Sequence, residues 1–315
     1  MPNYLCRHQG QPRHMLLDTK LPASYLFRGI RPDLVRVLLI SSFFHLLKLS
    51  IGAFLPPVPL QLPTILGSLI SLLLAFKTNQ SYERWWEARK VWGAIVNDSR
   101  TLVLQAGGFV PEAVLAAAPW PLRALAHRQI AWCYCLGETL RGLDPTATLT
   151  KFLSLSELEY TQPQANKPLA LLALHTAQLK ALYAQGSLNA YQQVQLDATL
   201  ARLCDALGQA ERLKSTVFPA SYRRLVHFFI YLFLLTLSLG LVQAIGLWEI
   251  PVLLTTASTF FLLERTARHL QDPFSNQPTD TPVTALARTV EINLRQLLLE
   301  TAVPAPLAPE GFYLL

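Results

Sequence analysis

Long apolar runs divide this sequence, and each run ends at a charged or proline-bearing boundary. The clearest covers residues 225–248, which contain no Asp, Glu, Lys or Arg. At about 1.5 Å of rise per residue, a helix of that length crosses a hydrocarbon core of about 30 Å. A break at residues 248–251 follows, and a shorter apolar segment then extends to Leu263. The pattern predicts a membrane hairpin over residues 224–264.

A similar pattern in the first half predicts another hairpin, over residues 33–76. Its first helix runs from Asp33 to about Leu55 and contains two charges, Arg36 and Lys48. Its second helix covers residues 60–76, which are apolar and follow a proline-rich turn. We therefore expect four transmembrane helices in two hairpins, with a short segment, residues 1–32, before them.

The segment between the hairpins, residues 77–223, has apolar residues at spacings of three and four rather than two. This period is typical of amphipathic helices. Proline-bearing breaks at 111–121, 144–145 and 163–168 divide the segment into several helices. After the second hairpin, residues 265–315 predict a further helix and an extended, proline-rich tail from residue 301. The predicted fold class is all-α, in a single domain.

Composition and charge agree with a membrane protein. The chain is 51% hydrophobic and 15% charged, whereas about 25% of the residues of a soluble domain are charged. Its net charge of +7 comes from 27 dispersed Lys and Arg residues with no run longer than two, which disfavours nucleic-acid binding. The two turns between the predicted helices contain only one charge, Glu249. The positive-inside rule therefore places both termini and the middle segment in the cytoplasm.

The sequence offers little for catalysis or metal binding. Cys133 and Cys135 are two apart and point to different sides of a helix, which is unsuitable for a zinc site; with Cys6 and Cys204 they are expected to be packed, reduced thiols. No spacing places a nucleophile beside a base, so we expect neither an enzyme nor a cofactor. His45 and His227, in or beside membrane helices, are expected to be neutral and hydrogen-bonded.

Residues 76–93, FKTNQSYERWWEARKVWG, follow directly on an apolar helix. By themselves they are typical of a helix that leaves the membrane with its Trp residues at the headgroups, and Arg84 and Glu87 are spaced to pair. Their order resembles the signature of the bestrophin family, especially its prokaryotic branch. Three later stretches resemble the same family: Phe218-Pro219 with Tyr222, residues 272–274, and residues 288–294. The residues that match in the first motif are Asn79, Tyr82, Arg84, Trp85, Trp86, Glu87, Arg89, Trp92 and Gly93.

The resemblance implies a homopentameric ion channel in a bacterial inner membrane, with one central pore that passes small inorganic ions. It places a hydrophobic neck at Ser68, Leu72 and Phe76, where Ser68 departs from the bulkier apolar residue usual in the family. Residues four apart lie along one stripe of a helix, as a pore lining requires. A second, cytoplasmic constriction falls at Tyr191, and a packed or exposed tyrosine there is the alternative.

Three questions stay open at this point. Lys77 follows the neck and either forms a ring that favours anions or pairs with a carboxylate or lipid headgroup. Selectivity is for chloride or for a monovalent cation such as sodium, and a non-conducting carrier or scaffold is the alternative function. Animal bestrophins have an acidic calcium site after the last span, where this chain has only scattered carboxylates, namely Glu264, Asp272 and Asp280.

Overall fold

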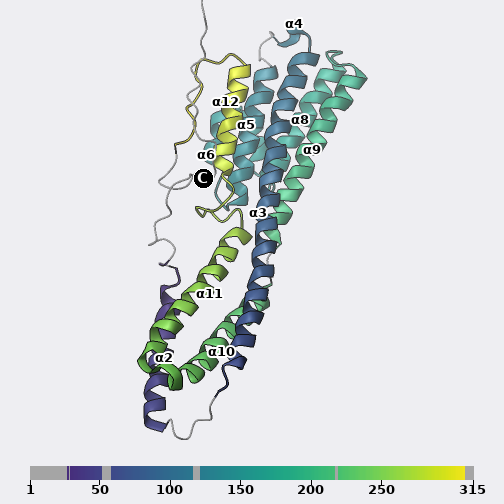
Figure 1. Ribbon diagram of the computed structural model, residues 1–315. Coiled ribbons are helices and arrows are strands. Elements are labelled where there is room, and N and C mark those ends of the chain that lie inside the picture. The colour runs from purple at the N-terminus through teal and green to yellow at the C-terminus, as the bar shows by residue number, and fades with distance from the viewer. Residues whose placement is uncertain (1–26, 28, 52–57, 116–120, 217–218, 309–315) are drawn as a thin grey trace, which may run out of the picture.

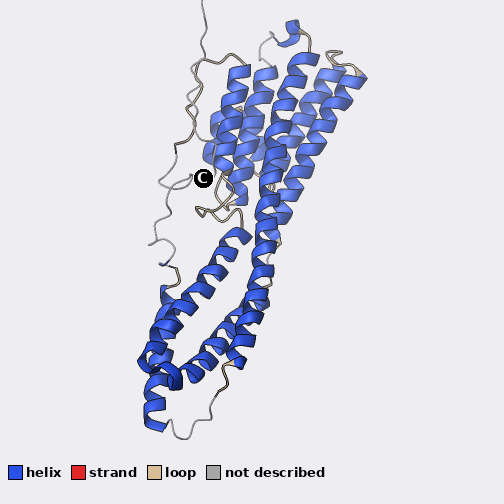
Figure 2. Cartoon of the chain, in the orientation of Figure 1, coloured by secondary structure: helices blue, strands red, loops and turns tan. Residues whose placement is uncertain are grey.

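The computed structural model describes residues 27, 29–51, 58–115, 121–216 and 219–308. Within those ranges the regular structure is entirely helical, with no strand (Figure 2). The expected thiol Cys6, Phe218 and most of segment 1–32 lie outside them, as do residues 309–315 of the expected tail. The elements fall into a layer of long helices and a separate bundle (Figure 1). The long helices are α2 (Arg31–Ile51), α3 (Gln61–Phe109), α10 (Ala220–Ile245) and α11 (Glu249–Gln271), with the 3-10 turn η2 (Gly246–Trp248) between the last two.

The bundle consists of the second half of α3 and the shorter helices that follow it. These are α4 (Glu112–Leu115), α5 (Pro121–Leu140), α6 (Thr146–Phe152), α7 (Leu155–Thr161), α8 (Lys167–Ala184), α9 (Ala190–Ser215) and α12 (Val283–Leu297). The three predicted breaks are confirmed. A further break comes before α9, where Gly186 takes a φ of 72° and Asn189 begins the helix with a capping box to Gln192.

Helix α3 joins the two parts. At about 1.5 Å per residue, its 49 residues extend about 74 Å, from the far end of the hairpin layer into the bundle (Figure 1). No proline interrupts it between Pro63 and Pro111, so one helix runs straight through the predicted boundary at residues 76 and 77. The two parts of the chain are therefore held in register by a continuous backbone.

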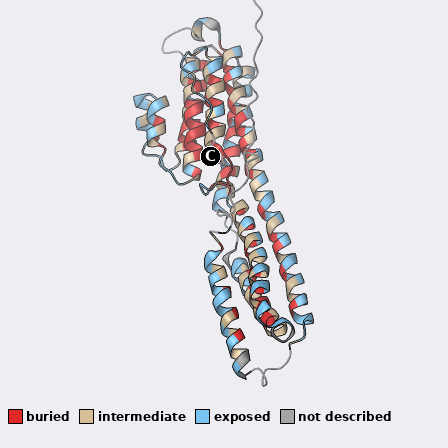
Figure 3. Ribbon diagram, turned by 60° about the vertical axis from the view of Figure 1, so that its left-hand side comes forward, coloured by how far each residue is buried: buried red, intermediate tan, exposed pale blue. Residues whose placement is uncertain are grey.

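Each part has its own apolar core. The bundle core contains large, fully buried side chains such as Trp92 and Trp132, and burial is concentrated there (Figure 3). The hairpin core is smaller and is centred on Ile70, Leu74 and Phe261. Large apolar residues such as Leu39, on α2, stay exposed in the hairpin layer. This arrangement is typical of helices that have lipid or other helices as their surroundings.

Among the described residues, three helical segments have the length and hydropathy to cross a membrane. They lie in α3, at Ser221–Leu241 in α10, and at Gly246–Gln271, which includes α11. The remaining predicted span, α2, is not among them; its first turns contain Arg31, Asp33 and Arg36. It nevertheless packs against α10 and α11 through Val37.

Cys133 and Cys135 are packed in the bundle as small apolar groups would be, whereas Cys204, also expected to be packed, is exposed on α9. Cys133 and Cys135 are both fully buried on α5, because this helix has neighbours on opposite sides. Burial raises the pKa of each thiol to about 12. A thiol with such a pKa is unreactive at neutral pH, which agrees with structural cysteines.

Arg84 connects three helices close to the point where the hairpins meet the bundle. Its Nε donates to the carbonyl of Gln271 at the end of α11, at 3.0 Å. Its Nη2 donates to the carbonyls of Leu213 and Thr216 at the end of α9, both at 2.9 Å. The last carbonyls of a helix lack partners within it, and a cation there also complements the helix dipole. The expected pair with Glu87 does not form, and Glu87 binds Lys90 instead, at 2.9 Å.

Replacing Arg84 by alanine should destabilise the protein, because three helix-end carbonyls lose a charged donor. We expect a loss of about 2–4 kcal/mol, measured as a lower Tm in detergent. Lys180→Ala, which removes an exposed cation from α8, is the matched control and should leave Tm within about 1 °C. Equal Tm values for both variants would contradict this role for Arg84.

Candidate functional site

The face of α3 that carries the predicted neck points away from the rest of the chain. Leu72 and Phe76 are 54% and 60% exposed, and Ser68 is exposed as well. The opposite face of the same helix is buried at Ile70 and Leu74, which pack against α10 and α11. The stripe therefore lies where a second copy, lipid or an aqueous pore has to cover it.

This face of α3 is apolar, and its serine hydroxyls donate hydrogen bonds to backbone carbonyls of the same helix. Ser68 Oγ donates to the carbonyl of Thr64 at 3.0 Å, one turn back in the helix, and Ser71 donates to Gly67 in the same way. A serine bonded in this way keeps only acceptor capacity toward its surroundings. The outer end of the stripe is thus weakly polar, and Leu72 and Phe76 make its inner part fully apolar.

A shallow groove of about 920 Å³ lies between α3 and α10 and includes two residues of the stripe, Ser68 and Leu72. Its first wall, on α3, combines small residues with Pro63 and Leu72, and the other wall consists of large apolar residues of α10 with Phe260 of α11. Gly67 belongs to the first wall, and a Cβ on it would lie 3.2 Å from the ring of Phe233. Small residues permit close approach of helices in membranes, so this groove is suited to receive another helix. Its α3 wall contains Thr64, Gly67, Ser68, Ser71 and Ala75.

Lys77 does not lie on the outward stripe. Its side chain is 1% exposed, and its Nζ is 2.8 Å from Oε1 of Glu264 on α11. Glu264 also accepts from Arg268 at 2.6 Å, and Nε2 of His227 lies 3.6 Å from it. Of the two alternatives for Lys77, the structure has the carboxylate pair.

The aromatic and charged motif after the stripe divides into inward and outward residues. Trp92 is fully buried, and Nε1 of Trp85 donates to the carbonyl of Thr279 at 3.1 Å. Tyr82 and Trp86 are half exposed and flank Trp85, with ring centroids 5.9 and 6.3 Å from its own. The motif therefore holds the end of α3 with one face and presents aromatic rings with the other.

The remaining motif residues lie at the helix surface. Asn79 Nδ2 donates to Oε1 of Glu83 at 3.0 Å. Arg89 is partly buried beside Gly93, on which a Cβ would lie 4.0 Å from its guanidinium. These contacts of Asn79 and Arg89 are thus with residues of α3 itself.

Tyr191 lies in the first turn of α9 and is 86% exposed. The other end of α9 is held by Arg84 through the carbonyl of Thr216. At about 1.5 Å per residue, Tyr191 is about 38 Å further along the helix axis. It therefore sits at the end of the bundle remote from the hairpin layer (Figure 1).

The scattered carboxylates after the last span stay apart, as expected. Glu264 pairs with Lys77, and Asp280 is buried, with Arg141 as its neighbouring cation. Burial raises the pKa of Asp280 above its usual value. Among the described residues, no three His, Cys, Asp or Glu side chains come together as a metal site would require.

Sequence reasoning missed one buried carboxylate. Glu249 is the first residue of α11 and was expected only as a charge in the turn before that helix. It is fully buried, accepts a hydrogen bond from Ser238, and lies 3.7 Å from Nδ1 of His45. The only available signal was an acidic residue in an otherwise uncharged turn beside two apolar helices, and that pattern does not distinguish a buried carboxylate from an exposed one.

Comparison with known proteins identifies the family. A family described as the bacterial and fungal bestrophin proteins matches residues 7–296. The chain belongs to the bestrophin family. Its membership covers the hairpins and the bundle alike, and the family and the curated relatives point to a channel rather than an enzyme.

Curated relatives are bacterial channel proteins. A voltage-dependent anion channel-forming protein of Ralstonia nicotianae is 28% identical over 91% of this chain and 95% of its own. One from Mesorhizobium japonicum is 31% identical over 79% of this chain and 78% of its own. The crystal structure of a bestrophin homolog from Klebsiella pneumoniae matches with a TM-score of 0.78 and 26% identity, over 86% of this chain and 99% of that one.

The Lys77–Glu264 pair generates a stability prediction. Glu264→Leu leaves a buried, unpaired ammonium and should cost roughly 3–5 kcal/mol, and Lys77→Met likewise strands the carboxylate, whereas the double variant Lys77→Met with Glu264→Leu should be closer to wild type than either single change. Arg268 is 42% exposed on its side chain and can turn to solvent in the double variant.

The measurement is Tm in detergent for the two single variants and the double variant. Glu87→Gln removes a pair whose side chains are 40% and 58% exposed, and as the control it should change stability by less than about 1 kcal/mol. Strictly additive losses in the double variant would exclude a coupled buried pair.

Proposed function

We propose that this protein is a homopentameric anion channel of a bacterial inner membrane, with a central pore lined by α3. The observation that carries the proposal is the apolar stripe of Ser68, Leu72 and Phe76, exposed on a helix whose opposite face is buried in its own subunit. The anion-channel relatives and the bestrophin homolog support the same function.

In this proposal five copies of the stripe form three successive rings. Leu72 and Phe76 make apolar rings, which resist wetting and thereby limit ion flow without binding the ions. Ser68 makes the outer ring, and its hydroxyl already donates within the helix, so this ring offers acceptors to water. The neck is accordingly tightest and driest at its inner two positions.

The second constriction is proposed at Tyr191. Its exposed ring lies at the remote end of α9, which becomes the cytoplasmic exit when the bundle lies in the cytoplasm. The Lys77 ammonium is buried in an ion pair and takes no direct part in the lining. Anion preference then has to arise from other groups along the path or from incomplete dehydration of the ion.

Membrane topology and subunit contacts complete the proposal. Helix α2 is the fourth span, both termini are cytoplasmic, and residues 77–223 form the cytoplasmic bundle between hairpins 33–76 and 224–264. The groove between α3 and α10 and the outward rings of Tyr82 and Trp86 are the surfaces proposed to meet neighbouring subunits.

The deciding experiment is a reversal potential in a planar bilayer under a KCl gradient. Reversal close to the chloride equilibrium potential is the expected result. Reversal close to the potassium potential would overturn anion selectivity and leave a cation channel. Absence of current from protein of pentameric mass would favour a non-conducting scaffold.

Leu72→Ala should raise single-channel conductance several-fold, because it widens and wets the ring proposed to be the dry part of the neck. The measurement is single-channel recording, with mass photometry to confirm the assembly. Leu39→Ala, which shortens a leucine 64% exposed on α2, is the matched control and should leave conductance unchanged. Equal conductance for wild type and Leu72→Ala would remove Leu72 from the neck.

A further inference from the structure

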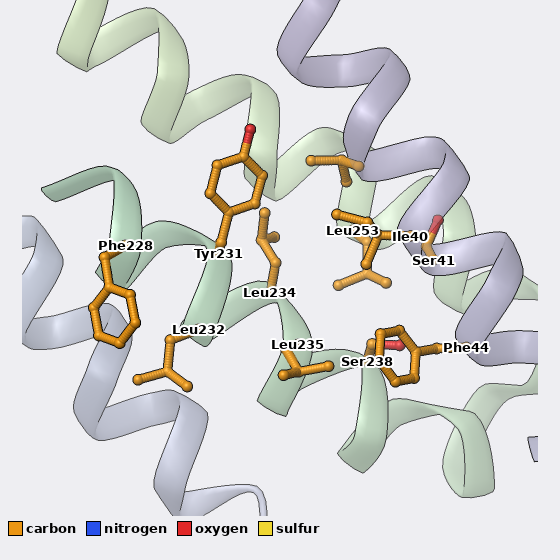
Figure 4. A pocket seen from close by; sticks show the side chains of 11 residues that line it. Ile40, Ser41, Phe44, Phe228, Tyr231, Leu232, Leu234, Leu235, Ser238 and Leu253 are labelled. Atoms are coloured by element: carbon orange, nitrogen blue, oxygen red, sulfur yellow. The ribbon is translucent and has the colours of Figure 1, made fainter. Parts of the chain in front are cut away.

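An apolar cavity of about 360 Å³ lies between α2 and α10, with Leu253 of α11 contributing to its wall. Figure 4 shows side chains from α2 and α10 lining it, including Ile40 and Phe44 from α2 and Phe228 and Leu235 from α10. The cavity is separate from the α3 stripe and serves no step of the proposed conduction. Its volume is at the small end of ligand pockets, about 300–1,000 Å³.

One end of the cavity is closed by a buried polar network. Ser238 lines the cavity, and its hydroxyl donates to the carboxylate of Glu249, which is fully buried. His45 lies beside the same carboxylate, with Nδ1 at 3.7 Å. The anionic group of a ligand cannot lie at this end of the cavity, because the buried carboxylate of Glu249 would repel that group.

Arginines mark the opposite end. Arg36 precedes Ile40 by one helical turn on α2, and Arg224 precedes Phe228 by one turn on α10, so each extends a stripe that lines the cavity. Both side chains are exposed. Arg36 Nη1 is 2.9 Å from Asp33, which also accepts from the hydroxyl of Tyr231, itself a lining residue. Two cations against one carboxylate leave this end positive.

We propose that the cavity binds one acyl chain of an anionic phospholipid of the cytoplasmic leaflet, whose phosphate lies against Arg36 and Arg224. The apolar lining matches the chain, and the arginines match the phosphate. Basic pockets between membrane helices on the cytoplasmic side are suited to such headgroups. The assignment of the leaflet rests on the proposed orientation of the channel, whereas lipid binding itself does not require conduction.

The test uses the full-length protein incubated with mixed vesicles of phosphatidylglycerol and phosphatidylcholine that carry the same acyl chains. After extraction and detergent washing, native mass spectrometry counts the lipids retained by the intact assembly. Because each Arg near an anionic surface contributes about 1 kcal/mol, or about fivefold, the two arginines together should make wild type retain phosphatidylglycerol in preference by about 25-fold.

Arg36→Gln should lower the preference about fivefold, and Arg36→Gln with Arg224→Gln should abolish it. Arg223→Gln removes an equally exposed neighbour that lies off the Phe228 stripe, and it should behave as wild type. An unchanged lipid ratio in the double variant overturns the proposal, as does equal retention of the two lipids by wild type.

Leu235→Trp should fill the cavity and reduce the retention of both lipids, whereas Leu39→Trp, on the exposed side of α2, should not. A changed assembly mass with unchanged lipid counts in Leu235→Trp would show that a second copy covers the cavity, which also overturns the proposal. The surface arginine variants keep the proposal testable where Leu235→Trp fails to fold. A failed channel recording leaves these counts unaffected, so the two proposals fail separately.

Discussion

The structure depends on one constraint: α3 has to pass from apolar surroundings to a water-facing bundle without a break. At this transition, helix ends and charges lie close to an apolar layer, and each needs a partner. Lys77 and Glu264 pair at 2.8 Å, and Arg84 donates to the ends of α9 and α11. These contacts attach both α11 and the bundle to α3, so the hairpin layer and the bundle keep a fixed relation.

The buried pair is a weak argument for stability alone, since an apolar pair of similar size is often equally stable. Its value here is geometric. The pair fixes the rotation of α3 against α11, and that rotation decides which residues of α3 face outward. With Lys77 turned inward, Phe76 and Leu72 point away from the subunit. A change of register at this point would turn a different stripe of α3 away from the subunit, which in the proposed channel is the pore side.

Much of the fold could be read from the sequence because its signals are local. Apolar runs predicted the helical hairpins, and prolines and glycines indicated the ends of most bundle helices. The partner of Lys77 could not be found in this way, because Glu264 is 187 residues away and nothing in its own surroundings indicates which cation it binds. The same holds for Arg84, whose nearest local partner, Glu87, competes with the distant carbonyls of Gln271, Leu213 and Thr216.

The candidate site could be predicted only in part, because its exposure also depends on contacts between distant segments. Spacing places Ser68, Leu72 and Phe76 on one stripe, but a stripe of Leu and Phe is equally typical of a packed helix. A pore lining differs from a packed stripe in that the opposite face of its helix is the buried one. On α3 that opposite face is buried within the chain through Ile70 and Leu74. A helix in one subunit has only one inward face. The outward apolar stripe therefore has to be covered by something outside this chain: lipid, a second copy or, in the proposed channel, a pore axis shared by several copies.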